Sequence, residues 1–476
     1  MAAYGTQAST LREVWHIGRL LSSTGSSDLW IQIQGSGTTA YMWKAAGGGA
    51  WSYDSDYVGG LAADRLVTGC SFNNEYFFCL GEGELMVMTP AGTIAQLHAS
   101  IATTALKPPQ GPRLVAANSS HLFLADVVDR GTSTRVPYRI YWCDTLNARI
   151  WGSGVGAGVS GIVDLADEPD AITGLYVQNE NLMVFKRRTI YYGQFVGPPV
   201  FYTFRRGVSG IGCVSAATIK EWKDGSIIWL GDDGVYIGGF GRTPQLVSAS
   251  INPRIRSTVS LSRLKQARAL LDADLGFYHL FLPDIVTPFT VNKIFTLNLN
   301  NGSWWEGTLG STFDVKATSD FSGGWVYGAT VDDFWNRTKL IAGTNGTLYY
   351  FDDTRTSDAG TAISCSWTSG YIPAHDLAGK LAQQVLPQTA RVFAKNTTPA
   401  TTLQLSGLLG FDRNTPTGPI ASSVQTLDGT SDLYVVGRGG PAEFLQLNMT
   451  CTGTAGTRIV GYEIGFIPEG DNTRRR

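Results

Sequence analysis

The stretch "IIWLGDDGVYIGGFGR", from Ile227 to Arg242, decides the fold. Two apolar runs, each long enough for one β-strand, flank Asp232, Asp233 and Gly234. An Asp-Gly pair between two such runs predicts a hairpin turn, in which the glycine takes a positive φ and the aspartates accept hydrogen bonds from backbone amides of the turn. Because neighbouring residues of a strand point to opposite faces, the two aspartates do not predict a catalytic carboxylate pair.

The same hairpin pattern occurs six more times along the chain. The further copies lie at residues 29–43, 76–88, 121–144, 182–193, 278–305 and 339–351. The turn residues expected from these hairpins are Gly83, Asp233, Gly234, Asn301, Gly302, Asn345 and Gly346. The copies recur roughly every 45 to 60 residues, which is the spacing of four-stranded propeller blades, and each blade needs neighbours to bury its faces.

The composition is typical of a many-stranded all-β protein. Of 476 residues, 57 are Gly, 21 Phe, 19 Tyr and 13 Trp, which suits tight turns and flat packed faces. We therefore predict an N-terminal arm (residues 1–25), a β-propeller (26–365) and a smaller C-terminal antiparallel domain, β-sandwich-like, with a loose basic tail (366–476). The hairpins indicate seven blades, or six if the copy at 29–43 belongs to another element. Residues 260–276 predict a short helical connector that leads into a strand.

Charge and cysteine content argue against several classes of protein. The net charge is −2, whereas a protein that grips nucleic acid by its phosphates is usually basic. The basic clusters at 186–188, 205–206 and 474–476 predict a solvated face or an interface. The six cysteines lack C-x-x-C spacing, which favours small buried thiols in a reducing cytoplasm. The start of the chain lacks the apolar core of a secretory signal, and no apolar run is long enough to predict a membrane span.

The sequence predicts no catalytic, cofactor-binding or metal-binding residues. The five histidines are scattered, and none makes the spacing of a metal-binding motif. Gly156, Gly158 and Gly161 fit G-x-G-x-x-G, but Pro169 follows and no helical period does, so we interpret them as a flexible loop. A propeller-borne glycosidase stays open, because its carboxylates would come from different blades. Trp304, Trp305 and Trp335 could stack on sugars, although such residues more often pack between blades.

One region resembles a known family of virion proteins. It begins with "RIYWCDTLNARIW" (139–151) and continues with "ITGLYVQNENLMVFKRRTIYYGQFVGPPVFYTFRR" (172–206). It then runs through "GVSGIGCVSAATI" (207–219) and "GSIIWLGDDGVYIGG" (225–239) to "INPRI" (251–255). This order of segments is similar to the tail nozzle or hub proteins of short-tailed bacteriophages, also called packaged-DNA stabilisation proteins. The resemblance covers about a quarter of the chain well.

The resemblance implies a structural, non-enzymatic component of a bacteriophage tail, made in the host cytoplasm. It implies a homo-oligomer, a sixfold ring below the portal and adaptor proteins, which retains the packaged genome and lets double-stranded DNA pass at ejection. Tail fibres or spikes are further expected partners. A near-neutral or acidic ring lumen would let DNA slide. The loops at 126–137 and 283–292 are expected to make subunit or gate contacts. The first alternative is a glycan- or receptor-binding tail protein, and the second is a propeller glycosidase.

Overall fold

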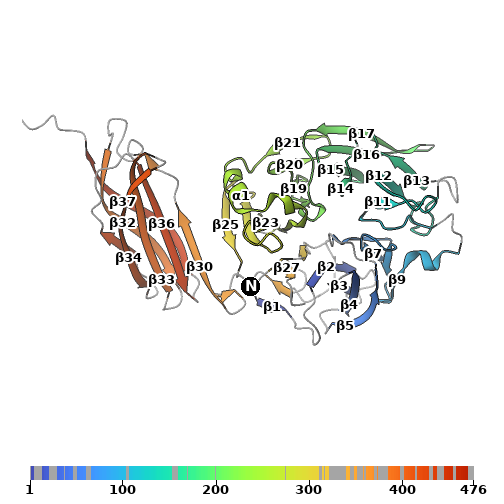
Figure 1. Cartoon of the computed structure of the whole chain (residues 1–476), viewed down its shortest axis with the longest axis horizontal. Helices are drawn as coiled ribbons and strands as arrows, with labels where there is room; N and C mark the ends of the chain where they lie inside the picture. The colour runs from blue at the N-terminus through green and yellow to red at the C-terminus, as the bar shows by residue number, and fades with distance from the viewer. Residues whose placement is uncertain are drawn as a thin grey trace, which may run out of the picture. The chain divides into compact units, whose positions relative to one another are not determined.

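Figure 1 shows the chain as a computed structural model, which divides into two compact units, Ala3–Phe351 and Asp352–Arg476 with Met1–Ala2. The structure describes residues 2–4, 13–20, 29–36, 38–46, 51–59, 66–102, 107–152, 159–168, 170–198, 200–273, 275–309, 314–315, 317–320, 339–342 and 348–350 of the first unit. In the second unit it describes the strands that lie between residues 357 and 469. Side chains are described between residues 14 and 315.

The described strands of the first unit form seven four-stranded sheets, of which six are built from consecutive strands. Blade 1 contains β2 (Glu13–Leu20), β3 (Leu29–Ser36), β4 (Thr39–Ala46) and β5 (Ser52–Tyr57). Blade 2 contains β6 (Thr68–Phe72), β7 (Glu75–Cys79), β8 (Met86–Met88) and β9 (Ile94–Gln96). Blade 3 contains β10 (Leu114–Ala117), β11 (Leu122–Val128), β12 (Arg135–Trp142) and β13 (Gly161–Asp164).

The next three blades follow the same order. Blade 4 contains β14 (Ile172–Gln178), β15 (Asn181–Lys186), β16 (Thr189–Gly197) and β17 (Phe201–Ser209). Blade 5 contains β18 (Lys220–Glu221), β19 (Ile227–Leu230), β20 (Val235–Gly239) and β21 (Arg242–Leu246). Blade 6 contains β22 (Arg268–Asp272), β23 (Phe277–Pro283), β24 (Val291–Asn298) and β25 (Trp304–Thr308). Short helices connect them: η1 (Leu97–Ser100), η3 (Ala216–Thr218), α1 (Asn252–Thr258) and η4 (Leu261–Gln266).

The seventh sheet closes the ring. It consists of β26 (Ala317–Asp320), β27 (Lys339–Ala342) and β28 (Leu348–Tyr350), and the N-terminal strand β1 (Ala2–Tyr4) lies beside β28. Its first strand, β26, contacts the first strands of both neighbouring blades, β22 and β2. The prediction of an all-β propeller with six to seven blades is therefore confirmed. The predicted connector at 260–276 is also confirmed, as η4 followed by β22.

The seven hairpins seen in the sequence are the second and third strands of the seven blades. These strands lie in the middle of their sheets, so neighbouring blades cover both of their faces, and they read as nearly continuous apolar runs. All four residues of β19 are buried, as are six of the seven residues of β11. The fourth strand of a blade lies at the outer edge, and β21 has only Pro244 buried. The sequences of edge strands therefore show a weaker hydrophobic pattern than those of the middle strands.

The core of the propeller lies between blades. Each of its five large clusters of buried apolar side chains joins two adjacent blades among the described residues. Between blades 4 and 5, Trp229 packs against Phe185 with ring centroids 5.4 Å apart, and its indole Nε1 donates to the carbonyl oxygen of Gly212 at 3.0 Å. Burying one large apolar side chain contributes roughly 1.5–3 kcal/mol. The expectation that aromatic residues fill the space between blades is met by Trp229, which is fully buried.

The turn at Asp232–Gly234 forms, but its chemistry differs from the prediction. Gly234 does not have a positive φ. It is required for space, because a Cβ there would lie 2.5 Å from Ser248 Oγ and 2.7 Å from Leu246 Cδ1. The Asp233 carboxylate accepts from the Tyr236 hydroxyl at 2.7 Å. Burial and this carboxylate raise the pKa of Tyr236 to about 12.

The other predicted turn residues have different outcomes. Gly302 has φ +73° between β24 and β25, and Asn301 Oδ1 accepts from the Ser303 amide at 3.0 Å, as a turn of this kind requires. Gly83 lies in the β7–β8 connection, where its carbonyl accepts from the Gly111 amide of the next blade, while Gly81 takes the positive φ. Asn345 and Gly346 lie outside the described residues.

The C-terminal unit consists of two described sheets. The larger is ordered β29 (Ser357–Asp358), β30 (Thr361–Thr368), β36 (Phe444–Gly453), β33 (Thr401–Asp412) and β34 (Thr415–Leu427), with β31 (Ile372–Pro373) also paired to β36. The smaller is ordered β35 (Asp432–Val436), β32 (Gln384–Asn396) and β37 (Thr457–Glu469). A sandwich of these two sheets stays a prediction.

Both predicted boundaries of the propeller differ from those of the structure. The expected arm, residues 1–25, contains β1 and β2, which belong to blades 7 and 1. The C-terminal unit begins at Asp352 and not at residue 366, because β30 pairs with β36, about 80 residues further on. Local composition does not reveal the partner of a strand that pairs at such a distance.

Exchanging glycine for asparagine at two turns separates the need for space from the need for a positive φ. Asparagine tolerates positive φ, and nothing lies within 4 Å of a Cβ at Gly302, so G302N is expected to cost less than about 1 kcal/mol. G234N is expected to cost about 1–3 kcal/mol, because its side chain would overpack the buried turn. Denaturant unfolding measures both, and equal losses would contradict the spatial role of Gly234.

Candidate functional site

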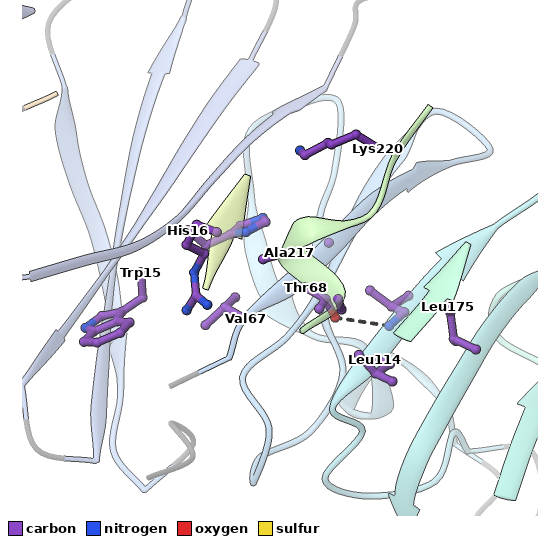
Figure 2. Close-up of a pocket in the computed structure, with 12 residues that line it drawn as sticks. Trp15, His16, Val67, Thr68, Leu114, Leu175, Ala217 and Lys220 are labelled. Atoms are coloured by element: carbon purple, nitrogen blue, oxygen red, sulfur yellow. Dashed lines mark hydrogen bonds between the residues drawn. The ribbon is translucent and has the colours of Figure 1, made fainter. Parts of the chain in front are cut away.

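A cavity of about 210 Å³ lies where the first strands of the blades converge (Figure 2). Its lining comes from β2, β6, β10, β14 and β22, together with η3 and β18. The lining residues are Trp15, His16, Val67, Thr68, Gly69, Leu114, Val115, Leu175, Ala216, Ala217, Lys220 and Arg268. Because six blades contribute, the cavity occupies the centre of the propeller, where propellers have their channel.

His16 and Tyr76 form a polar pair at this centre. His16 Nε2 and the Tyr76 hydroxyl lie 2.7 Å apart. His16 is half-buried and lines the cavity. Burial lowers the pKa of His16 to about 4, with a smaller contribution from the positive charge of Arg268. Burial also raises the pKa of Tyr76 well above its usual value. The pair is therefore neutral at pH 7.

Two glycines make room for this pair. A Cβ at Gly18 would lie 2.4 Å from the Tyr76 ring, and a Cβ at Gly69 would lie 2.5 Å from the Tyr76 hydroxyl and 2.8 Å from His16 Nε2. Neither glycine has a positive φ, so their role is close approach. Two inner strands, β2 and β6, thus meet around one tyrosine of the second blade.

Two cationic side chains reach the cavity from adjacent blades. Arg268 begins β22 and is 4% exposed, and its Nη1 donates to the carbonyl oxygen of Ala267 at 3.1 Å. Lys220 begins β18 and is half-buried. On another wall, Thr68 Oγ1 donates to the Arg113 carbonyl and accepts from the Val115 amide, both at 3.1 Å, which joins blades 2 and 3.

The four cysteines whose side chains are described are not placed for nucleophilic chemistry. Cys79, Cys143 and Cys213 are buried, and Cys70 is half-buried. Burial raises the pKa of each of these thiols, which keeps them protonated at pH 7. In the C-terminal unit, Cys365 and Cys451 lie opposite each other on β30 and β36. The expectation of small buried thiols is confirmed for the first three.

The basic clusters at 186–188 and 205–206 take part in ion pairs and hydrogen bonds, whereas the one at 474–476 lies outside the described residues. Lys186 is fully buried, and its Nζ donates at 2.5 Å to the carbonyl oxygens of Leu165 and Glu168. Burial lowers its pKa. Arg187 is exposed and donates from Nε to both carboxylate oxygens of Asp232 at 2.9 Å, which joins blades 4 and 5. The prediction of a solvated face for this cluster is thus confirmed for Arg187 and wrong for Lys186.

Of the glycine motif, Gly156 and Gly158 lie outside the described residues, and Gly161 begins β13. A Cβ at Gly161 would lie 2.2 Å from Trp142, so this glycine serves strand packing. Across the part of the chain whose side chains are described, no group of three or more His, Cys, Asp and Glu residues could hold a metal ion. No helix there is long and apolar enough to cross a membrane.

The two predicted contact loops differ in character. In the 126–137 loop, Arg135 Nη1 donates to Asp126 Oδ1 at 3.0 Å and Arg139 pairs with Asp129, so charges within blade 3 hold it. The 283–292 loop exposes Ile285, Val286 and Phe289, and the Arg263 guanidinium lies 4.4 Å from the Phe289 ring centroid. Neighbouring exposed apolar side chains of this kind often mark a site of interaction with another molecule.

No protein-family profile matches the sequence, and no curated protein sequence matches it. Among solved structures, the chain is similar to the Pan2 WD40 domain of Neurospora crassa, with 9% identity and a TM-score of 0.38 over 72% of this chain and 96% of that one. It is also similar to the extracellular domain of a one-component system from B. thetaiotaomicron, with 9% identity and a TM-score of 0.35 over 69% of this chain. The chain spans 42% of the length of that second structure. The propeller itself follows from the strand order and pairing described above.

None of the described polar residues that line the central cavity was predicted from the sequence. His16, Lys220 and Arg268 stand one to a blade, so no short motif contains two of them. Their position in the chain could have identified them as candidates, because each lies in the strand that precedes a predicted hairpin. That position identifies the innermost strand of a blade.

The neutral state of His16 makes stability depend on pH. The pKa is lower in the folded chain, about 4, than the ordinary 6.5, so the unfolded chain binds more protons between these values. Stability from this group is present above pH 6.5 and is lost as pH falls towards 4, by up to about 3 kcal/mol. NMR of ¹³C-labelled histidines should show His16 titrating below pH 5, and H16Q should flatten the stability profile. A midpoint near 6.5 would contradict burial.

Proposed function

We propose that this chain is a structural component of a bacteriophage tail, a nozzle or hub whose copies form a ring that continues the DNA channel below the portal and adaptor. One observation carries the proposal. The residues that resemble tail nozzle proteins, 139–255, are consecutive propeller strands, from β12 through all of blades 4 and 5 to α1. The resemblance therefore spans blades 4 and 5, together with parts of blade 3 and of α1.

The contacts between blades suit a part that must keep its shape under load. Among the described residues, Arg149 of blade 3 binds Glu75 of blade 2 through two hydrogen bonds of 2.6 and 2.7 Å. Glu82 of blade 2 accepts from Arg113 of blade 3 at 2.9 Å. Bidentate arginine–carboxylate pairs are geometrically specific as well as strong. They tie neighbouring blades together through charged side chains, in addition to the apolar contacts.

The oligomeric state tests this function. The purified chain is expected to give a light-scattering mass about six times its 51.3 kDa, and negative-stain electron microscopy is expected to show sixfold rings. A closed ring of this kind repeats one heterologous interface. V286D is expected to lower the mass if the exposed loop at 283–292 makes subunit contacts, while T287D in the same loop is the matched control. A monomer at every concentration would contradict the ring.

One observation favours a glycan-binding tail protein as the second candidate. Trp305 is 45% exposed, and Phe277 contacts it edge-on with ring centroids 5.5 Å apart. Its neighbour Trp304 is half-buried and donates from Nε1 to the Val247 carbonyl at 3.0 Å. Of these two tryptophans, Trp305 thus presents an aromatic face of the kind that stacks on a sugar ring.

A glycan array separates the two candidates. The glycan-binding function predicts a specific signal that W305A reduces at least tenfold, because the stacking surface is removed. Y53A is the matched control, since Tyr53 is also an exposed aromatic residue, 50% exposed in blade 1. Absence of any signal from folded protein would count against this candidate and leave the tail scaffold as the better account.

A further inference from the structure

We infer that Cys365 and Cys451 form a disulfide when the chain meets an oxidising environment, and that this bond fixes β30 to β36 in the C-terminal unit. The site is independent of the proposed tail function. The strand register, the pattern of the sheet and the place of β30 in the chain support it.

The two cysteines are register partners on neighbouring antiparallel strands (Figure 1). Residues 363–368 of β30 pair with residues 448–453 of β36 without a register shift, and Cys365 stands opposite Cys451 within that run. Directly opposed residues of an antiparallel pair have Cα atoms about 4.5 or 5.5 Å apart, depending on the hydrogen-bonding position. Both spacings lie within the range of about 4.4–6.8 Å that a disulfide bridges. The backbone is therefore already placed for the bond.

The cysteines of the propeller show that closeness in the sequence does not produce such a pair. Cys70 and Cys79 lie on the two strands of one hairpin, β6 and β7, yet neither is the register partner of the other. All four propeller cysteines are free. Among the described strands, Cys365 and Cys451 are the two cysteines that the pairing places opposite each other.

The cysteine pair lies on the apolar face of the larger sheet. Successive residues of a strand alternate between the two faces, and register partners share a face. The face with the cysteines also carries Ile363, Trp367, Met449, Leu403 and Leu405. The other face carries Ser364, Ser366, Thr450, Thr452, Thr402 and Gln404. A disulfide needs no strong hydrogen-bond partner, so the apolar face suits it.

The bond would hold the strand through which the chain enters the larger sheet. β30 is the first long strand after the propeller, with eight residues against two in β29. It pairs with β36, which pairs with β33 on its other side. A bond between Cys365 and Cys451 closes a long loop that contains β31, β32, β33, β34 and β35. Cross-links that close long loops restrict the unfolded chain, so this bond is expected to stabilise the unit.

A small disulfide such as oxidised glutathione supplies the oxidising equivalents. The thiolate of one cysteine attacks a sulfur of this reagent, which forms a mixed disulfide and releases one glutathione thiolate. The thiolate of the other cysteine then attacks the protein sulfur of the mixed disulfide and releases the second glutathione thiolate. Overall, the protein loses two electrons and two protons, and one glutathione disulfide becomes two thiols. A reducing cytoplasm keeps both cysteines as thiols, so the bond forms after the chain leaves such an environment.

Mass spectrometry of the oxidised chain tests the bond. The full-length wild-type chain is purified with reductant and incubated with an excess of oxidised over reduced glutathione, and its remaining thiols are alkylated in denaturant. A second sample is refolded from denaturant in the same buffer, so that a sheet which excludes the reagent does not hide the result. We expect a linked peptide that joins Cys365 to Cys451 in a nonreducing digest.

Two variants locate the bond. C451S is expected to form no internal disulfide, whereas C70S, the matched control in the propeller, still forms the bond between Cys365 and Cys451. Thermal unfolding gives a second measure. Oxidation is expected to raise an unfolding temperature of the wild type and of C70S by roughly 5 °C or more, and to leave that of C451S unchanged.

Two results would overturn the bond. The first is wild-type protein in which Cys365 and Cys451 are both alkylated as thiols after incubation and after refolding. The second is a disulfide that joins either of them to a propeller cysteine. A bond that forms without any rise in unfolding temperature would overturn its stabilising role. Because these assays need no assembly, the disulfide and the sixfold ring can fail separately.

Discussion

The whole propeller depends on the packing of one blade's middle strands against those of the next. A four-stranded blade is covered only when neighbours lie on both sides, so every blade requires the ring to be complete. Trp229 illustrates the contact, because it fills the space between blades 4 and 5 and leaves no polar atom unsatisfied. Closure follows from the same requirement. The N-terminal strand β1 joins β28 in the last sheet, and the two ends of the unit are held together there.

Close packing also explains why so many glycines are needed. At Gly18, Gly69, Gly161 and Gly234 the backbone does not have a positive φ, and a neighbouring side chain occupies the place of the missing Cβ. Three of these neighbours are aromatic residues or their hydroxyls. Glycine and aromatic residues therefore act together in this fold. Where a strand has a glycine, the missing side chain leaves room for an aromatic ring to approach the backbone closely.

The central cavity is a product of the same geometry. Seven first strands converge on one axis, so residues that are about 50 positions apart or more in the chain become neighbours. His16, Lys220 and Arg268 meet there, each held by its own blade. A rigid ring fixes their separation better than a loop would.

The sequence by itself determined the repeat. Hairpins such as 76–88 and 227–239 are visible because their strands are buried on both faces and end at turn residues, and their spacing is that of blades. Only the tertiary structure decided the boundaries, since β1 and β30 pair with strands far away in the chain. It also decided why Gly234 is a glycine and which polar residues share a cavity. Those facts depend on side chains from different blades, and their distances are set by ring closure, which no local pattern contains.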